Sequence, residues 1–371
     1  MSAGPPARVV DQWDAKAASM GLGADPAANA VSRRNRRPRP SGLTLHRADG
    51  GRSGTGADCA QRGIPNASRS GHPGWVVAAR LRPRCEISRG VMARLPEGTQ
   101  GTPGAAREIA PDVHCLGPHG RTQTNVYFVR SGSSWVLIDA GWAKDGSWIK
   151  RAAESVFGAD TPAASILLTH VHPDHAGAAL ELARTWECPV YMHPDELPIA
   201  NGDFAAMAKF AGPLDHWVVL PMMRAVGRRR REAILARSSL RDVAHPFEPG
   251  AGVPGLPGWE CIPTPGHTPG HVSFLRASDG VLITGDAVVT LKVNSLAGLL
   301  LQQQGLSGPP RYTSWSWRAA RESVAKLARL EPVVLAGGHG IPLAGAAAAE
   351  TLSAFAAQFA GDVAKPDRSR S

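Results

Sequence analysis

The sequence predicts an α/β (α+β) fold in which two β-sheets pack face to face and helices cover their outer surfaces. Two observations support this. Strand-like runs joined by a turn alternate with strand–helix units, and the same succession occurs twice between residues 106 and 361. An element with one apolar face has to bury that face against another layer. Residues 106–361 are therefore predicted to form one domain.

The first half opens with a hairpin. Two apolar, β-prone runs at residues 125–129 and 135–139 are separated by RSGS, a turn sequence. After the hairpin, helical spacing of apolar residues alternates with short apolar runs typical of buried strands. The predicted elements are a helix at 147–157, a strand at 166–168, a helix at 178–185 and a strand at 189–192.

The second half repeats this pattern, with three strands followed by a helix, a strand and a helix. These elements are predicted at 259–262, 272–275, 281–284, 317–330 and 333–335, with an Ala-rich helix that ends near residue 359. Between the halves, residues 203–241 form a helical insertion of weaker periodicity. It is either a lid whose apolar side chains contact a substrate or a helix pair packed on the sheets. Those side chains are Phe204, Met207, Phe210, Trp217, Met222 and Met223.

The ends of the chain differ from the domain in composition. Residues 1–105 are rich in Gly, Pro, Ala, Arg and Ser without sustained periodicity, which predicts disorder, as does the tail at 362–371. Residues 1–91 hold 15 Lys or Arg against 6 Asp or Glu, so they carry +9 of the net charge of +10. Met92 is an alternative start of the chain. A basic arm can bind nucleic acid, but this one lacks interleaved aromatic residues, so no nucleic-acid partner is expected.

Composition argues against several other classes of protein. Five widely spaced cysteines with no CxxC pair indicate neither a disulfide framework nor a thiolate metal site. No apolar run reaches the roughly 18 residues of a membrane span, and the arginines at 33–39 are not followed by an apolar segment. We therefore expect a cytoplasmic protein with no membrane partner. The run Arg228–Arg231 predicts a solvated helix face, with steering of anionic substrates as the alternative.

Four motifs concentrate His and Asp directly after predicted strands: LLTHVHPDHAG at 167–177, TPGHTPGH at 264–271, TGDA at 284–287 and GGHG at 337–340. Their glycines allow sharp turns and close backbone approach. Strand ends on one edge of a sheet converge, so these residues can line one cleft. Imidazole and carboxylate are ligands for zinc, and also for iron or manganese.

The spacing within the first motif suggests two half-sites. His170 and His172 can point to one side of an extended turn, while Asp174 and His175 aim at a second point nearby. Each half-site needs one more imidazole and a shared carboxylate, and His267, His339 and Asp286 have the required chemistry. A solvated, histidine-rich loop is the alternative, but so many ionisable groups beside apolar strands would be costly without a metal.

HVHPDH resembles the HxHxDH signature of the metallo-β-lactamase fold superfamily, and the likeness continues through the other three motifs over about residues 110–345. The resemblance implies an αββα four-layer sandwich. It also implies that His170, His172 and His267 hold one metal ion, and that Asp174, His175 and His339 hold a second, with Asp286 bridging. By the same resemblance, Asp139 orients a ligand histidine, although it could instead cap a turn. His271 supports a neighbouring residue or packs, and is not a ligand.

The expected activity is that of a metallo-hydrolase with two divalent metal ions, zinc first and iron or manganese open. A metal-bound hydroxide would attack an ester, thioester or lactone bond of a small molecule, and Asp174 would carry the proton. Asp at position 286 departs from the Cys or Ser usual in true β-lactamases of this fold, which disfavours antibiotic hydrolysis. A mononuclear iron persulfide dioxygenase and a nucleic-acid phosphodiesterase that uses the basic arm remain alternatives. The sequence does not indicate an oligomeric state.

Overall fold

A computed structural model describes residues 104–361 of the protein. The predicted disorder of residues 1–105 and 362–371 and the alternative start at Met92 fall outside this range, apart from residues 104 and 105. Between residues 104 and 361, no helix combines the length and the apolar character that crossing a membrane requires.

The first sheet has seven strands, and their order across the sheet is the order of the chain. Strands β1 to β4 pair antiparallel, whereas β4 to β7 pair parallel. Parallel neighbours need a crossover, which the helices between them supply. The strands are β1 (Arg107–Ala110), β2 (Val113–His119), β3 (Thr124–Ser131), β4 (Ser134–Ile138), β5 (Ser165–Leu167), β6 (Val190–Met192) and β7 (Ala244–Pro246). The crossover helices are α2 (Gly146–Phe157) and α4 (Ala179–Trp186).

The second sheet has five strands in the order β14-β13-β10-β9-β8. Its single parallel pair joins β10 to β13, across α10 (Trp317–Ala328). Its strands are β8 (Trp259–Pro263), β9 (Val272–Arg276), β10 (Val281–Gly285), β13 (Val334–Gly337) and β14 (Leu343–Ala344). A separate ribbon pairs β11 (Val289–Leu291) with β12 (Gln304–Ser307), which flank α9 (Leu296–Leu300), and α11 (Ala347–Gly361) ends the described chain.

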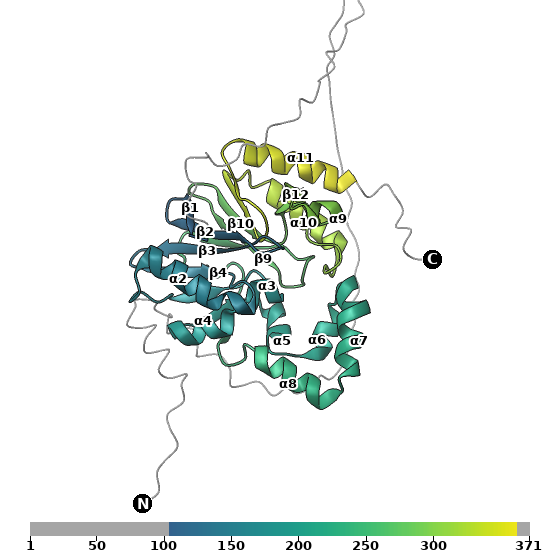
Figure 1. Cartoon of the computed structure of the whole chain (residues 1–371). Coiled ribbons are helices and arrows are strands. Elements are labelled where there is room, and N and C mark those ends of the chain that lie inside the picture. The colour runs from purple at the N-terminus through teal and green to yellow at the C-terminus, as the bar shows by residue number, and fades with distance from the viewer. Residues whose placement is uncertain (1–103, 362–371) are drawn as a thin grey trace, which may run out of the picture. The chain divides into compact units, whose positions relative to one another are not determined.

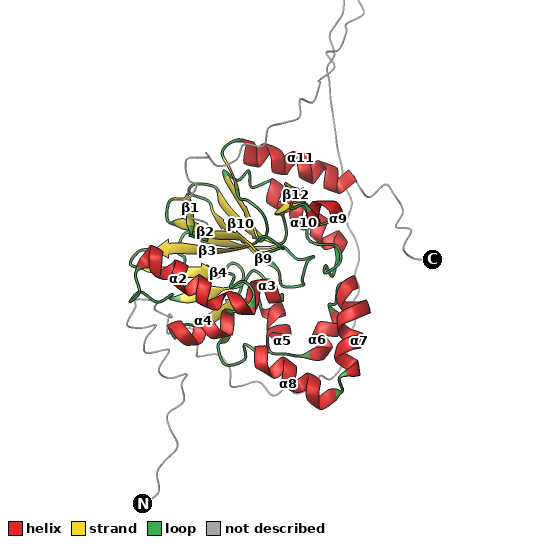
Figure 2. Ribbon diagram, viewed as in Figure 1, coloured by secondary structure: helices red, strands yellow, loops and turns green. Residues whose placement is uncertain are grey.

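Three clusters of buried residues define four layers. The cluster between the sheets contains Tyr127 and Ile138 of the first sheet and Phe274 and Ile283 of the second. A second cluster joins the first sheet to α2 and α4, and a third joins the second sheet to α10 and α11. Figures 1 and 2 show the two sheets between these helices. The predicted αββα sandwich is therefore confirmed.

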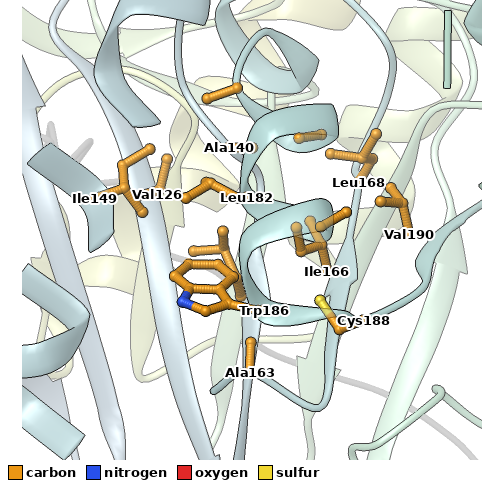
Figure 3. Packing of buried hydrophobic residues seen from close by; sticks show 14 of the residues in the cluster. Val126, Ala140, Ile149, Ala163, Ile166, Leu168, Leu182, Trp186, Cys188 and Val190 are labelled. Carbon is orange, nitrogen blue, oxygen red and sulfur yellow. The ribbon is translucent and has the colours of Figure 1, made fainter. Parts of the chain in front are cut away.

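Alternation along the strands explains how one sheet serves two cores. Successive side chains of a strand point to opposite faces, so Phe128 packs under the helices while its neighbours Tyr127 and Val129 face the other sheet. Figure 3 shows the helix side of this arrangement, with Leu182 and Trp186 of α4 packed near Ile166 of β5. A strand buried on both faces reads as a continuous apolar run, which is how β3 and β5 appear in the sequence.

The region between β6 and β7 is helical. It contains α5 (Leu197–Ala200), α6 (Phe204–Lys209), a π-helix (Asp215–Val219), α7 (Leu220–Ala225) and α8 (Arg228–Ser238). From α6 to the end of α8, the helices bury only Leu220 fully. We call residues 204–241 the helical segment.

The predicted elements occur within about two residues of their expected ends, and the differences are additions. Strands β1, β2, β7, β11, β12 and β14 and helix α9 were not expected. Most of these strands have four residues or fewer, so they are too short to show an alternating pattern. Strand β2 is longer, but its sequence VHCLGPH includes Gly and Pro, which strands usually avoid.

Candidate metal centre

The predicted ligands all lie in segments that directly follow strands, and two of them, Asp174 and His175, lie in a short helix. Residues 170–175 follow β5 and run into the short helix α3 (Pro173–Ala176), whereas His267 follows β8. Asp286 follows β10, and His339 follows β13. Because β5 belongs to the first sheet and the other three strands to the second, the site forms where segments at the ends of strands from both sheets come together.

The seven residues predicted as metal ligands fall into three overlapping groups, and within each group the ligand atoms lie within 4.8 Å of one another. The groups are His170, His172 and His267; His170, His175 and Asp286; and Asp174, His175 and His339. The first and third groups are the two half-sites implied by the family resemblance. The middle group places Asp286 between them, so none of the seven residues is left outside the cluster.

The carboxylate of Asp286 faces both halves. Its Oδ2 lies 3.3 Å from Nε2 of His267 and 3.3 Å from Nε2 of His339, and its Oδ1 lies 3.4 Å from Nε2 of His175. In the second half, Oδ2 of Asp174 lies 3.5 Å from Nε2 of His339. Oδ2 thus lies near an imidazole of each set and Oδ1 near a second imidazole of the second set, so this carboxylate is placed to contact two cations.

The residues fit metal ions because several of their inward atoms have no other partner. Nε2 of His170, Nε2 of His175 and Oδ1 of Asp286 are buried and make no hydrogen bond, although the last two face each other at 3.4 Å. A buried polar atom without a partner costs about 1–3 kcal/mol. Three such atoms in one cluster, all of ligand type, are explained if cations satisfy them together.

In the first half-site, His170 and His172 favour the neutral form. Burial lowers the pKa of His170 well below its usual value, and the neighbouring His175 lowers it further. Burial likewise lowers the pKa of His172 to about 3, and His267 adds to the effect. The Nδ1 of His172 and the Nε2 of His267 lie 2.8 Å apart, within hydrogen-bonding distance of each other, and both belong to the group that includes His170. A deprotonated imidazole nitrogen is the form that binds a metal.

The second half-site is dominated by carboxylates. Burial alone would lower the pKa of His175 and of His339, but the neighbouring carboxylates together outweigh it and raise both, with Asp286 the largest contributor and Asp174 acting on each. In turn, burial would raise the pKa of Asp286, but the imidazoles of His339 and His175 hold it well below its usual range. The cluster is thus electrostatically paired.

The outer nitrogen of each of four ligand histidines has a partner that fixes the ring. These contacts are His170 Nδ1 with Thr169 Oγ1 at 3.0 Å, His175 Nδ1 with Asp139 Oδ2 at 2.8 Å, His267 Nδ1 with Ser314 Oγ at 3.1 Å, and His339 Nδ1 with the Thr122 carbonyl at 2.8 Å. Such partners hold the tautomer and the orientation of a ligating imidazole. Of the four partners, only Asp139 was predicted.

Asp139 does more than contact one histidine. Besides accepting from His175, its carboxylate accepts from the backbone N–H of Thr169 at 2.8 Å and from the hydroxyl of Thr169. It is 1% exposed and has a φ of 59°, a left-handed conformation that few residues other than glycine adopt. The sequence left two roles open for Asp139, which were to orient a ligand histidine or to cap a turn. In the structure the same carboxylate contacts His175 and stabilises the turn at Thr169.

His271 has no nitrogen free for a metal. Its Nδ1 pairs with the hydroxyl of Thr264 at 2.8 Å, and its Nε2 accepts the backbone N–H of Asp286 at 3.0 Å. The ring thereby fixes the loop that carries Asp286. Gly338 is needed nearby, because a Cβ there would collide with Asp286 and His175.

Glu196 was missed by the sequence analysis. It lies in the turn Pro194–Glu196 after β6 and is fully buried. Its two oxygens accept the backbone N–H of Val171 at 3.0 Å and of Gly270 at 2.9 Å, so it ties the loop of His170 and His172 to the loop of His267. Burial raises its pKa. The available signal was its position, since it too follows a strand.

Tyr312 and Asp215 interact electrostatically with residues of the site. Burial raises the pKa of Tyr312, and the charges of Asp286 and Asp174 raise it further, so the phenol lies within electrostatic reach of both half-sites. The carbonyl of Tyr312 accepts the backbone N–H of Leu214 at 2.6 Å, which ties the helical segment to this loop. Burial also raises the pKa of Asp215, whose carboxylate interacts with His267.

The helical segment presents its apolar side chains in different directions. The ring of Phe210 packs edge-on against Trp315, with centroids 5.5 Å apart, and the backbone N–H of Trp315 donates to the carbonyl of His267. In contrast, Trp217 and Met222 are 77% and 59% exposed. Phe210 can therefore line the approach to the site, whereas Trp217 and Met222 face solvent.

Comparison with known proteins agrees with this geometry. A sequence profile of the metallo-beta-lactamase superfamily matches residues 119–339. The probable metallo-hydrolase YflN of Bacillus subtilis (strain 168) is 38% identical over 247 residues, which are 65% of this chain and 89% of that protein. The uncharacterized protein YobT of the same organism is 30% identical over 223 residues, 58% of this chain and 82% of that protein.

Solved structures resemble the chain more distantly. A beta-lactamase domain protein from Burkholderia ambifaria matches 73% of this chain and 81% of its own length, with a TM-score of 0.48 and 20% sequence identity.

Proposed function

Because the chain belongs to the metallo-beta-lactamase superfamily, we propose that it is a dinuclear metal-dependent hydrolase that cleaves an ester, thioester or lactone bond in a small molecule. One observation carries this proposal: seven buried or half-buried His and Asp side chains form two adjacent sets with Asp286 between them. Curated relatives named as probable metallo-hydrolases support the hydrolytic class.

The two sets of side chains would hold two divalent cations. His170, His172 and His267 would hold the first. Asp174, His175 and His339 would hold the second, and Asp286 would contact both. Bound there, divalent cations, with zinc as the first choice, would polarise the oxygen of the scissile bond and acidify a water molecule.

Asp174 is suited to move the proton. Its side chain is 18% exposed, whereas that of Asp286 is 3% exposed, so Asp174 reaches the solvent side of the cluster. A carboxylate in that position can accept a proton from water and deliver it to the leaving oxygen or sulfur. This is the role expected of it from the sequence.

The border of the site favours a substrate with an apolar part beside the scissile bond. Phe210 and Trp315 form an aromatic pair next to the loop of His267, and the phenol of Tyr312 can donate a hydrogen bond to a substrate oxygen. An acyl chain or ring would lie against the aromatic pair. Esters, thioesters and lactones all meet this description.

The first experiment is elemental analysis of protein purified without chelators or added metal. We expect two zinc ions per chain and a clear decrease in Asp286→Asn, together with loss of hydrolysis in a lactone, thioester and carboxylic-ester screen. Asp279→Asn is the matched control, because that carboxylate pairs with Arg276 outside the cluster and its loss should change neither quantity.

Other results of the same experiment separate the alternatives. One iron per chain with oxygen consumption on a persulfide would replace the hydrolase with the dioxygenase. Hydrolysis of a phosphodiester that is lost on deletion of residues 1–91 would favour the nucleic-acid enzyme. Protein that binds no metal would contradict the proposal altogether.

A further inference from the structure

The outer face of the π-helix and α7 is apolar and uncovered. Leu214, Trp217, Val218 and Met222 are 41%, 77%, 53% and 59% exposed, and Pro221 and Ala225 are exposed as well. These positions recur every three or four residues, so they share one helix face. We call these six residues the outer apolar face. Contiguous exposed apolar surface of this kind marks a site of interaction.

The opposite face of the same helices is turned inward. Val219, Met223 and Val226 are half-buried and Leu220 is 2% exposed. The helices are thus already packed through one apolar face, and the outer apolar face is a second one. Packing among residues 104–361 does not account for it.

Charge singles out the same region. Residues 204–241 hold eight Lys or Arg against two Asp or Glu, a net charge of +6, whereas the other described residues hold 14 against 20, a net charge of −6. Arg224 and Arg228 to Arg230 are exposed. Arg224 lies between Met222 and Ala225 of the outer apolar face in the chain, and Arg228 to Arg230 begin α8 three residues after Ala225. The positive charge is therefore concentrated in the same segment as the exposed Trp217.

We propose that the outer apolar face and the arginines of α7 and α8 dock the protein on an anionic lipid surface. An amphipathic helix with Trp and aliphatic residues on one side and basic residues beside them lies in the headgroup region of such a surface. The arginines are attracted to anionic headgroups, while the apolar side chains enter the acyl boundary. This docking is peripheral, and it departs from the expectation of no membrane partner, which rested on the lack of a spanning segment.

The charge pattern disfavours a second copy as the occupant. A symmetric dimer through the outer apolar face would bring two segments of charge +6 together, and like charges at an interface are unfavourable. Nucleic acid would pair with the arginines but would leave Trp217, Val218 and Met222 in water. An anionic lipid surface satisfies both kinds of side chain.

The test is flotation of the full chain with phosphatidylcholine–phosphatidylglycerol vesicles, compared with vesicles of phosphatidylcholine alone. We expect flotation with the anionic vesicles only. Trp217→Ser should lower the partition coefficient about tenfold or more, since burial of a large apolar side chain is lost. Arg229→Gln with Arg230→Gln should lower it as well and weaken its dependence on salt.

A matched pair of valines controls for non-specific binding of exposed apolar side chains to vesicles. Val218 and Val333 are 53% and 50% exposed, but Val333 lies outside the helical segment. Val218→Ser should reduce binding, and Val333→Ser should leave it unchanged. Metal content should stay the same in all four variants.

Three results would overturn the proposal. The first is absence of flotation by the unmodified protein. The second is equal flotation of Trp217→Ser, Val218→Ser and the unmodified protein, which would assign binding to the basic residues 1–91 present in all of them. The third is a dimer in sedimentation velocity that Trp217→Ser converts to a monomer, which would make a second copy the occupant.

Discussion

The candidate metal centre and the helical segment distribute polar and apolar side chains in opposite ways. We call the segments that carry the seven proposed ligands the metal-binding edge. At the edge, polar groups are buried and most of them are held by named partners, as Asp139 and Glu196 hold the loops that carry the ligands. In the helical segment, apolar groups such as Trp217 and Met222 lie in solvent. Each inverts the usual distribution of side chains, and each inversion indicates a ligand: cations at the edge and a surface at the segment.

The difference also separates chemistry from recognition. The edge is fixed by buried hydrogen bonds, so it can be altered only at a large cost. The helical segment is attached through few buried residues, so its sequence can change without loss of the fold. We expect the reaction type to depend on the first region and the substrate and location to depend on the second.

The largest expected effect concerns the stability of the core that supports the metal-binding edge. Phe128 in β3 is fully buried and packs edge-on against Trp135 and Phe157. Phe128→Ala should lower the free energy of unfolding by about 3–5 kcal/mol, since it leaves a cavity between sheet and helix. Urea denaturation of the metal-loaded protein measures this change. A loss below about 1 kcal/mol would mean that the core there can collapse into the space.

The second prediction compares one histidine from each region. His267→Ala removes a member of the first half-site and should lower hydrolysis about 10²–10³-fold, the usual cost of losing one electrostatic group of an active site. His216→Ala removes an exposed histidine of the π-helix and should leave the rate unchanged. Rates with the best substrate of the screen and metal content per chain are the two measurements. Equal losses of hydrolysis in the two variants would show that the reaction does not depend on the metal-binding edge more than on the helical segment.

The sequence alone indicated the candidate metal ligands better than the groups that hold them in place. The seven proposed ligands were found because His and Asp after apolar strands are unusual and the strands bring them to one edge. Three of the four partners of the outer nitrogens were not found, since Thr169, Ser314 and the carbonyl of Thr122 are ordinary groups whose position alone makes them partners. Only the folded arrangement identifies such groups.

For the fold, the sequence predicted the main layers but not the short strands. The long apolar runs of β3 and β4 and the amphipathic α2, α4 and α10 carried enough periodicity to fix the layers. The two-residue β14 and three-residue β7 form because a neighbouring strand offers its edge, which no local pattern reveals. Likewise, the direction of Trp217 could not be read from its type, because an apolar residue in a helix usually faces a core.

The third prediction tests how strongly the edge is held. Asp139→Asn keeps the size of the side chain but removes the charge that faces Nδ1 of His175 and the hydroxyl of Thr169. Partners of this kind typically change metal affinity about 10–100-fold. Competition with a chelating dye should therefore show weaker binding in the second half-site. Asp203→Asn, at the exposed start of α6, is the control and should bind metal normally. Unchanged affinity in Asp139→Asn would limit Asp139 to stabilising its turn.

The smallest expected effect tests whether an exposed apolar side chain of the helical segment contributes to stability. Ile234 in α8 is 42% exposed, so Ile234→Ala should change the free energy of unfolding by no more than about 0.5 kcal/mol, as for most surface substitutions. Urea denaturation at two protein concentrations checks this. A loss several times larger that depends on concentration would show that Ile234 is covered by another copy in solution. In that case the exposure of the segment, and with it the contrast to the metal-binding edge, would hold only for the isolated chain.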